Sequence, residues 1–199
     1  MLTIVWDVDD VLNELTKYWF EKTWIKLNPG CKITYKDLIE NPPHKILGVS
    51  LDEYLNSLDS FRLSQEAEKL EPVLEVISWF KEYGHYFRHI ALTSAPIISV
   101  HSSAMWVLRH FGCWIRSFNF VPSGRKGLRI PIYDENKANF LSWFGKADIL
   151  IDDNASIIAS AMRLNIKTIL FPRPWNDNNK TIHETLELLN KFIYYDTNN

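Results

Sequence analysis

Short apolar runs alternate with stretches of helical periodicity over most of this chain. From residue 73 onward the pattern predicts helices over 73–83 and 98–111, further helices after Asp134, Asn154 and Thr181, and strands between them over 89–93, 118–121, 149–151 and 168–171. Gly84 and Gly112 are typical ends for the first two helices. Because strands and helices alternate, the sequence predicts a doubly wound α/β fold, in which helices cover both faces of a parallel sheet.

The most informative stretch precedes this alternating part. Ile4-Val5-Trp6 predicts a buried strand, and Asp7, Asp9 and Asp10 follow it directly. Side chains on a strand alternate between faces, so Asp7 and Asp9 would share one face, and the turn after the strand can bring both to one ligand. Carboxylates so close together need a cation or strong hydrogen-bond donors to stay ionised, because burial and like charge both raise carboxylate pKa values. Magnesium with a phosphate would meet that need, although an isolated pair of this kind is more often an acidic turn.

Residues 14–71 interrupt the alternation, because their pattern is helical and contains no convincing strand. We therefore expect a small helical cap over 14–71, inserted into a catalytic core that comprises 1–13 and 72–199. Ser50-Leu51-Asp52-Glu53 and Thr181-Ile182-His183-Glu184 fit capping boxes, and Thr34-Tyr35-Lys36-Asp37 fits one more weakly. The prolines of Asn41-Pro42-Pro43 must interrupt any helix at that point.

The beginning of the expected cap is unusually aromatic. Its aromatic residues are Tyr18, Trp19, Phe20 and Trp24. We interpret them as a hydrophobic core that joins the cap to the sheet, in preference to a surface on which nucleic-acid bases stack.

Composition narrows the range of functions. The chain has 199 residues, 46% of them hydrophobic, which is enough for one catalytic domain with a modest insertion. Its 22 basic and 24 acidic residues give a net charge of -2, so we expect neither polymeric nucleic acid nor an anionic membrane as a partner. Cys31 and Cys113 show neither metal-binding nor disulfide spacing. The sequence shows no secretory leader and no membrane span, so we expect a cytoplasmic protein, and a homo-oligomer stays open.

Four polar elements share one predicted position, which is the carboxyl end of a strand or the loop or helix just past it. They are the acidic motif Asp7-Val8-Asp9, the pair Thr93-Ser94, Lys137 and the pair Asp152-Asp153. Each has an ordinary explanation when taken alone, since hydroxyls cap helices, lysines at helix starts are solvated and Asp pairs form turns. In a doubly wound sheet, however, all four would meet at one edge and could surround one phosphate. We favour this joint interpretation.

These four elements resemble the motifs of the haloacid dehalogenase superfamily. The superfamily core would account for residues 1–13 and about 72–175, and the helical insert would match its small caps. The resemblance implies that Asp7 attacks phosphorus as the nucleophile, and that Asp9 protonates the leaving group and later activates water. Branches that cleave carbon–halogen or phosphonate bonds lack this second aspartate. Asp9 therefore favours hydrolysis or transfer of a phosphate ester.

The hydroxyl pair and the lysine would bind the phosphoryl group. The resemblance implies that Thr93 binds its oxygens, with Ser94 beside it, and that Lys137 neutralises nucleophile and phosphate together. Elementary chemistry supports these roles, because a carboxylate that attacks a phosphate dianion is repelled unless cations are fixed beside both.

The same resemblance implies a magnesium ion. Its ligands would be Asp7, the main-chain carbonyl of Asp9 and one of the pair Asp152-Asp153, together with phosphate and water. Asp153 is implied as the direct ligand. Asp152 would then not bind the metal directly, and would instead orient Lys137 and a water.

Three segments also resemble a narrower group, the 5′-nucleotidases of the deoxyribonucleotidase type, which carry DxDGVL, TSP and LLIDD at corresponding places. The segments here are Asp7-Val8-Asp9-Asp10-Val11-Leu12, Leu92-Thr93-Ser94-Ala95-Pro96 and Leu150-Ile151-Asp152-Asp153-Asn154. Asp10 stands where that group has glycine, and Ala95 intervenes before the proline. The resemblance implies a nucleoside monophosphate as the substrate, with the cap selecting the base.

Other functions stay open at this point. A phosphatase of the same chemistry could act on another small phosphate ester or on a polynucleotide end. A receiver-type signalling domain also combines these residue types on a doubly wound sheet, but there a lysine comes last, whereas here the pair Asp152-Asp153 does. A catalytically silent phosphate-binding protein is disfavoured because the set of site residues is intact.

One further feature is the basic run Gly124-Arg125-Lys126-Gly127-Leu128-Arg129. We interpret it as a solvated loop, in preference to a loop that captures phosphate, because it contains glycine and lacks interleaved aromatic residues. The six histidines form no spaced cluster and pair with no candidate nucleophile, so we assign them no function.

Overall fold

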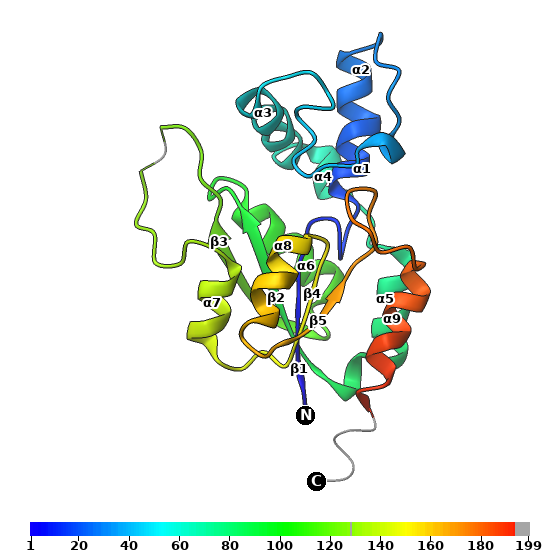
Figure 1. Cartoon of the computed structure of the whole chain (residues 1–199), viewed down its shortest axis with the longest axis vertical. Coiled ribbons are helices and arrows are strands. Elements are labelled where there is room, and N and C mark those ends of the chain that lie inside the picture. The colour runs from blue at the N-terminus through cyan, green and yellow to red at the C-terminus, as the bar shows by residue number, and fades with distance from the viewer. Residues whose placement is uncertain (128, 194–199) are drawn as a thin grey trace.

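A five-stranded parallel sheet forms the centre of the protein in the computed structural model, which describes residues 1–127 and 129–193 (Figure 1). Its strands are β1 (Thr3–Trp6), β2 (Arg88–Ala95), β3 (Ile115–Pro122), β4 (Ile149–Asp152) and β5 (Lys167–Leu170). Their spatial order is β3-β2-β1-β4-β5, and every pair of neighbours is parallel. The predicted fold class is confirmed. Strand order reverses beside β1, and ligands of such sheets bind beyond the carboxyl ends of the strands at that point.

Helices cover both faces of the sheet, and the strand side chains alternate between them. Trp6, Ile149 and Ile151 pack into the larger hydrophobic core, to which α5 (Leu74–Tyr83), α6 (Val100–Phe111) and α9 (Ile182–Asn190) contribute. Val5 and Leu150 belong to the smaller core under α7 (Lys137–Phe144) and α8 (Ala155–Met162). Both faces are apolar because both are covered, which is why the strands have continuous hydrophobic runs.

An aromatic cluster fills the centre of the larger core. The ring centroids of Trp6 and Phe80 are 4.7 Å apart, and those of Phe80 and Phe111 are 5.0 Å apart. His89 is satisfied within this cluster, because its Nδ1 accepts from the Trp6 indole and its Nε2 donates to the Gly84 carbonyl. Burial lowers the pKa of His89 to about 4, so it is neutral at ordinary pH. This histidine is a structural residue.

The segment between β1 and α5 is helical. It contains α1 (Leu15–Trp19), a π-helical turn (Phe20–Trp24), α2 (Ile25–Leu27), a 3₁₀ turn (Tyr35–Asp37), α3 (Leu51–Arg62) and α4 (Gln65–Glu68). Figure 1 shows these helices together beyond the carboxyl ends of the strands, so they lie over the edge where ligands are expected. We call this segment the helical cap.

Aromatic side chains stabilise the cap itself. Trp19, Phe20 and Trp24 are buried, as expected for core residues. Their contacts, however, lie mainly within the cap, since the Trp19 ring meets the edge of Tyr54 at 5.2 Å and its indole nitrogen donates to Ser57 Oγ. The cap therefore has an aromatic centre of its own, which continues into the larger core of the sheet.

Several ends of elements differ from the sequence prediction by a few residues. The second strand continues to Ala95, and the helix after it begins at Val100. The delay has a local cause, because both the backbone and the hydroxyl of Ser99 donate to the Pro96 carbonyl and form a turn there. The capping box at Thr181 and Glu184 is complete, whereas the predicted box at Ser50 has only its first bond, from the Glu53 backbone to the Ser50 hydroxyl. The polar C-terminal tail from Asp196 lies outside the described residues.

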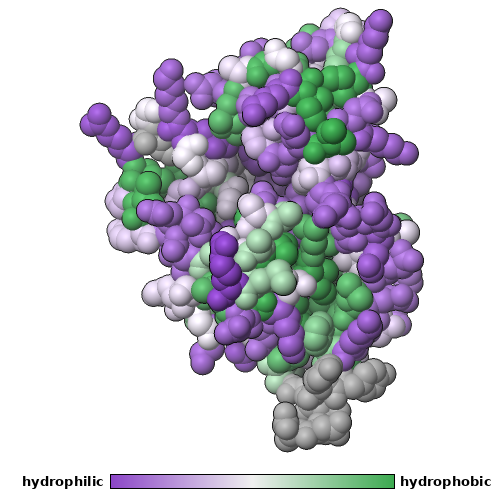
Figure 2. All heavy atoms as spheres, in the orientation of Figure 1, coloured by the Kyte–Doolittle hydropathy of each residue, from purple (hydrophilic) through white to green (hydrophobic). Residues whose placement is uncertain are grey.

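Hydrophilic residues dominate the rim of the face seen in Figure 2, and hydrophobic residues gather over α8 and β5. The edge strand β5 is only partly covered, since its third residue alone is buried. This apolar area lies below the edge where the candidate site is found.

Phe80→Ala should destabilise the protein by about 3–5 kcal/mol, because it removes a fully buried ring from the aromatic cluster and leaves a cavity. The matched control is Leu74→Ala in the same helix, where the side chain is 73% exposed and the expected change is about 0.5 kcal/mol or less. Urea unfolding measures both. Equal effects for the two variants would contradict the described packing.

Candidate active site

One pocket at the carboxyl edge of the sheet brings together the site residues that the sequence predicts. Its lining includes Asp7, Asp9, Thr93, Ser94, Lys137 and Asp153. These residues follow β1, lie on β2, begin α7 and follow β4, so the crossing connections bring distant parts of the chain to one place. Cap residues complete the wall, and they are Thr16, Asn41, Tyr54, Leu58 and Arg62. Asp152 lies below, and is fully buried.

Lys137 is the buried cation of the site. Its ammonium lies 2.7 Å from Asp7 Oδ1 and 2.7 Å from Asp152 Oδ2, and its side chain is 1% exposed. Burial by itself lowers the pKa of Lys137, but the neighbouring Asp152 and Asp7 outweigh burial and raise it above its ordinary value. Lys137 is therefore charged, and it orients both carboxylates.

Three carboxylates converge around this lysine. Asp7, Asp152 and Asp153 each offer an oxygen, and these oxygens lie within 4.8 Å of one another. Burial raises the pKa of Asp7 to about 7 despite the opposing effect of Lys137. Burial, together with Asp152 and Asp7, also raises the pKa of Asp153 well above its ordinary value. One ammonium cannot balance three carboxylates, so an additional cation would stabilise the cluster. All-oxygen ligands fit a hard divalent ion such as Mg²⁺.

Hydrogen bonds distinguish the two carboxylates at the end of β4. Asp152 Oδ2 accepts from Lys137, and its Oδ1 accepts from the backbone of Asn154 at 2.9 Å. Asp153 instead accepts at Oδ2 from the Trp175 indole at 2.6 Å, and its main-chain carbonyl accepts from Asn176. Asp152 is therefore engaged at both oxygens, whereas the bond from Trp175 orients Asp153 toward the pocket.

The loop after β5 contributes residues that the sequence analysis missed. Trp175 and Asn176 hold Asp153, and Arg173 donates from Nε to the Asp10 carbonyl at 2.6 Å. Their sequence signal was weak but present, because they follow the predicted strand over 168–171 and so fall at the same edge of the sheet as the four motifs.

Asp10 has a left-handed backbone, with a φ of 63°. This conformation favours glycine and costs a non-glycine residue about 1–2 kcal/mol, although aspartate tolerates it better than most. The side chain offsets the cost, because it accepts from both the backbone and the hydroxyl of Thr16 at the start of the cap. Burial raises the pKa of Asp10 to about 6, against opposing effects from Arg173 and Thr16. Asp10 thus fastens the first cap helix to the turn that carries Asp7 and Asp9.

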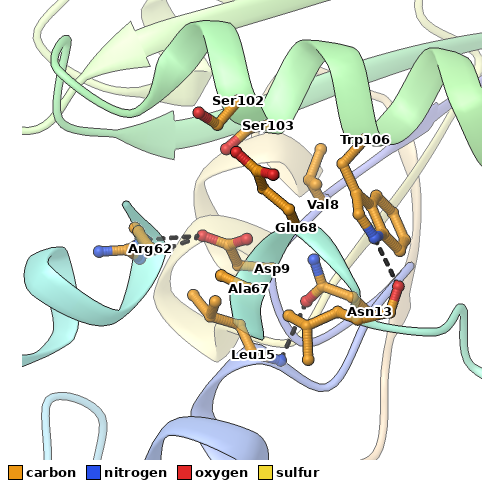
Figure 3. Close-up of a pocket in the computed structure, with 11 residues that line it drawn as sticks. Val8, Asp9, Asn13, Leu15, Arg62, Ala67, Glu68, Ser102, Ser103 and Trp106 are labelled. Carbon is orange, nitrogen blue, oxygen red and sulfur yellow. Dashed lines mark hydrogen bonds and ion pairs between the residues drawn. The ribbon is translucent and has the colours of Figure 1, made fainter. Parts of the chain in front are cut away.

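Asp9 pairs with an arginine that the sequence analysis did not predict. Arg62, at the end of α3, places Nη2 at 3.0 Å and Nε at 3.3 Å from Asp9 Oδ2. Figure 3 shows Arg62 beside Asp9, with dashed lines joining the two side chains. A basic residue at a helix C-terminus is common for electrostatic reasons, so its position gave no functional signal.

The hydroxyl pair and the basic run predicted from the sequence contain both buried and exposed side chains. Thr93 is buried at the end of β2, and Ser94 beside it is exposed. In the basic run, Lys126 and Arg129 are exposed as expected for a solvated loop, and Leu128 lies outside the described residues. The solvated-loop interpretation is wrong for Arg125, whose side chain is 16% exposed because it forms an ion pair with Asp59 of the cap.

Comparison with known proteins gives a fold and no close relative. No protein-family model matches the sequence, and a search of curated proteins gives no match. A haloacid dehalogenase-like hydrolase from Streptococcus pneumoniae superposes with a TM-score of 0.63 at 14% identity, over 96% of this chain and 98% of that one. The protein has the haloacid dehalogenase fold. The match covers the cap as well as the core.

Two further solved structures share this fold. A protein from Lactobacillus delbrueckii described as a phosphoglycolate phosphatase has a TM-score of 0.59 at 12% identity, over 96% of this chain and 97% of that one. A hydrolase of the same superfamily from Bacillus subtilis, solved with bound magnesium, has a TM-score of 0.50 at 14% identity, over 97% and 98%. At these identities the likeness shows the fold alone.

Among the described residues, no helix has the length and apolar character needed to cross a membrane.

The carboxylate cluster predicts a pH dependence of stability for the metal-free protein. The folded-state pKa of Asp7, about 7, lies above its ordinary value of 3.8, so the folded state holds the proton more tightly. This contribution is complete below about pH 4 and is lost as the pH rises through about 7. Asp10 and Asp153 act with the same sign. We therefore expect the free energy of unfolding in EDTA to fall between about pH 5 and pH 8.

Urea unfolding at both pH values measures this effect. Asp7→Asn should reduce the fall, because it removes the titrating group, and Mg²⁺ should raise stability more at the higher pH, where the carboxylates are ionised. A metal-free protein that becomes more stable over this range would contradict the described cluster.

Proposed function

We propose that this protein is a magnesium-dependent phosphohydrolase that acts through an aspartyl-phosphate at Asp7. The observation that carries the proposal is the position of Asp7 at the topological switch point of the sheet. There Asp7 forms an ion pair with the buried Lys137, and it lines one pocket with Asp9, Thr93 and Asp153. The shared fold supports it, because all three structural neighbours reported above are described as hydrolases or phosphatases.

Asp7 and Asp153 would hold the magnesium ion, together with the main-chain carbonyl of Asp9. Asp152 is engaged by Lys137 and by the Asn154 backbone, which supports a role in orienting the lysine rather than as a direct ligand. When bound, magnesium would neutralise charge on the phosphate and the attacking carboxylate. The magnesium bound to the Bacillus subtilis neighbour supports this choice of ion.

In the first step a carboxylate oxygen of Asp7 forms a bond to phosphorus, and the bond from phosphorus to the leaving oxygen breaks. Asp9 gives its proton to that oxygen. Lys137 and the Val8 backbone both donate to Asp7 Oδ1, which fixes the plane of the attacking carboxylate. Thr93 and Ser94 would donate hydrogen bonds to the phosphoryl oxygens.

In the second step water attacks phosphorus, and the bond between Asp7 and phosphorus breaks. Asp9, now ionised, takes a proton from that water and returns to its starting state. Covalent catalysis of this kind divides one difficult displacement into two easier ones. Lys137 stays between Asp7 and Asp152 throughout, so the carboxylate that leaves phosphorus is stabilised as it forms.

The substrate we propose is a small phosphate ester, most specifically a nucleoside monophosphate. The motif residues around Asp7, Thr93 and Asp153 support the nucleotide, because they resemble those of the deoxyribonucleotidase type. A different small ester is the second candidate, favoured by the neighbour described as a phosphoglycolate phosphatase. A cytoplasmic location stays a prediction from the sequence.

Phosphate release tests the proposed activity. With Mg²⁺, the protein should release phosphate from nucleoside monophosphates faster than from sugar phosphates, phosphoglycolate or phosphorylated oligonucleotides, and Asp7→Asn should abolish release because it removes the nucleophilic charge. Asp52→Asn, at an exposed carboxylate in the cap, is the control and should keep wild-type activity. A preference for sugar phosphates would overturn the nucleotidase proposal, and normal activity of Asp7→Asn would overturn the mechanism.

Asp9→Asn should lower kcat by about 10²–10⁴-fold, because proton transfer to the leaving group and from water would both lose their acid–base residue. Rapid-quench experiments with labelled substrate separate formation of the phosphoenzyme from its hydrolysis. Both rates should fall. If neither does, Asp9 is not the acid.

A further inference from the structure

Two arginines and two aspartates form an unbroken chain of contacts that crosses twice between the cap and the core. Arg125, in the loop after β3, binds Asp59 of α3 through Nε at 2.5 Å and Nη2 at 3.0 Å. Asp59 accepts from Nη1 of Arg62, one turn further along the same helix, at 2.8 Å. Arg62 then donates to Asp9, which follows β1. Both ends of the chain therefore lie in the core, and its middle lies in the cap.

Each member of the chain is largely shielded from water. The side chains of Arg62 and Asp9 are 11% and 16% exposed, and Asp59 is 9% exposed. Shielded ion pairs with paired hydrogen bonds are strong, whereas exposed pairs contribute little. An exposed pair at the same boundary provides the contrast, because Lys126 and Asp52 are separated by 4.0 Å and are 88% and 60% exposed.

The geometry of Arg62 fixes the carboxylate of Asp9. Two of its N–H groups converge on one oxygen, Asp9 Oδ2, while a third is bound by Asp59. A guanidinium is planar, so a carboxylate on each side determines its orientation. In the close-up, Arg62 approaches Asp9 from the cap (Figure 3). The orientation of Asp9 is thus set by a residue outside the core on which Asp9 lies.

We propose that Arg62 is a positioning residue for Asp9, and that Arg125 holds Arg62 in place through Asp59. This inference rests on the proposed function, in which Asp9 moves a proton in both steps. Its consequence is that Asp9 is oriented for proton transfer only while α3 lies against the core. Docking of the cap and acid–base catalysis are then one event.

Leaving groups of different basicity distinguish positioning from simple structural support. An alkyl phosphate releases a strongly basic alkoxide and needs a well-placed proton donor, whereas p-nitrophenyl phosphate releases a weakly basic phenolate and needs one much less. Loss of a positioning residue should therefore harm the alkyl ester more. Loss of general stability would harm both substrates by the same factor.

The experiment compares wild-type protein with Arg62→Met, Arg62→Lys and Arg125→Met, using a nucleoside monophosphate as the alkyl ester and p-nitrophenyl phosphate as the other substrate, with Mg²⁺. Arg62→Met should lower kcat on the nucleotide by roughly 10–100-fold, with a smaller loss on the aryl ester and little change in KM. Arg62→Lys should recover part of kcat, and Arg125→Met should show a smaller loss of the same kind.

Lys126→Met is the matched control, since it removes a neighbouring cation from the exposed pair, and it should leave both activities unchanged. Circular dichroism and urea unfolding verify that each variant is folded. Should Arg62→Met not fold, the Lys variant and Arg125→Met carry the same comparison, because each keeps at least one cation beside Asp59.

The outcomes separate the inference from the function beneath it. Equal loss on both esters, a change in KM alone, or wild-type kinetics in Arg62→Met would overturn the positioning role while wild-type turnover upholds the proposed function. If the wild-type protein released phosphate from neither ester, the proposed function would be overturned, and the inference with it.

Discussion

The ammonium of Lys137, buried between Asp7 and Asp152, is the contact on which the site depends. Burying a charge costs several kcal/mol unless partners compensate it, so α7 must start where its first residue meets the ends of β1 and β4. Lys137 does not balance the charge of the cluster, because Asp153 adds a third carboxylate to Asp7 and Asp152. A divalent cation would offset this negative charge, and the lysine fixes the orientation of the Asp7 carboxylate.

A second set of contacts joins the cap to this site. Asp10 adopts a backbone conformation suited to glycine, and its carboxylate holds Thr16 at the start of the first cap helix. Arg62 returns from the end of α3 to Asp9. The cap is thus bound on both sides of its sequence to the turn that carries the candidate catalytic aspartates. Contacts from the start of the cap and from the end of α3 therefore converge on this one turn.

Much of the fold follows from local patterns, and so do the motifs of the site. Apolar runs separated by helical periods predict the parallel sheet, and residues that follow its strands must meet at one edge, where Asp7, Thr93 and Asp153 line one pocket. The ends of elements depend on single side chains, as at Val100, where a turn held by Ser99 delays the start of α6.

The sequence by itself determined the alternation of strands and helices, the inserted helical segment and the order of the acidic, hydroxyl and amino groups, because periodicity and turn chemistry are local properties. Only the tertiary structure decided that Arg62 binds Asp9, that Arg125 is an ion-pairing residue rather than part of a solvated loop, and that Trp175 orients Asp153. These partners lie far apart along the chain. Their pairing depends on how the cap and the last loop pack against the sheet, and no local pattern records that.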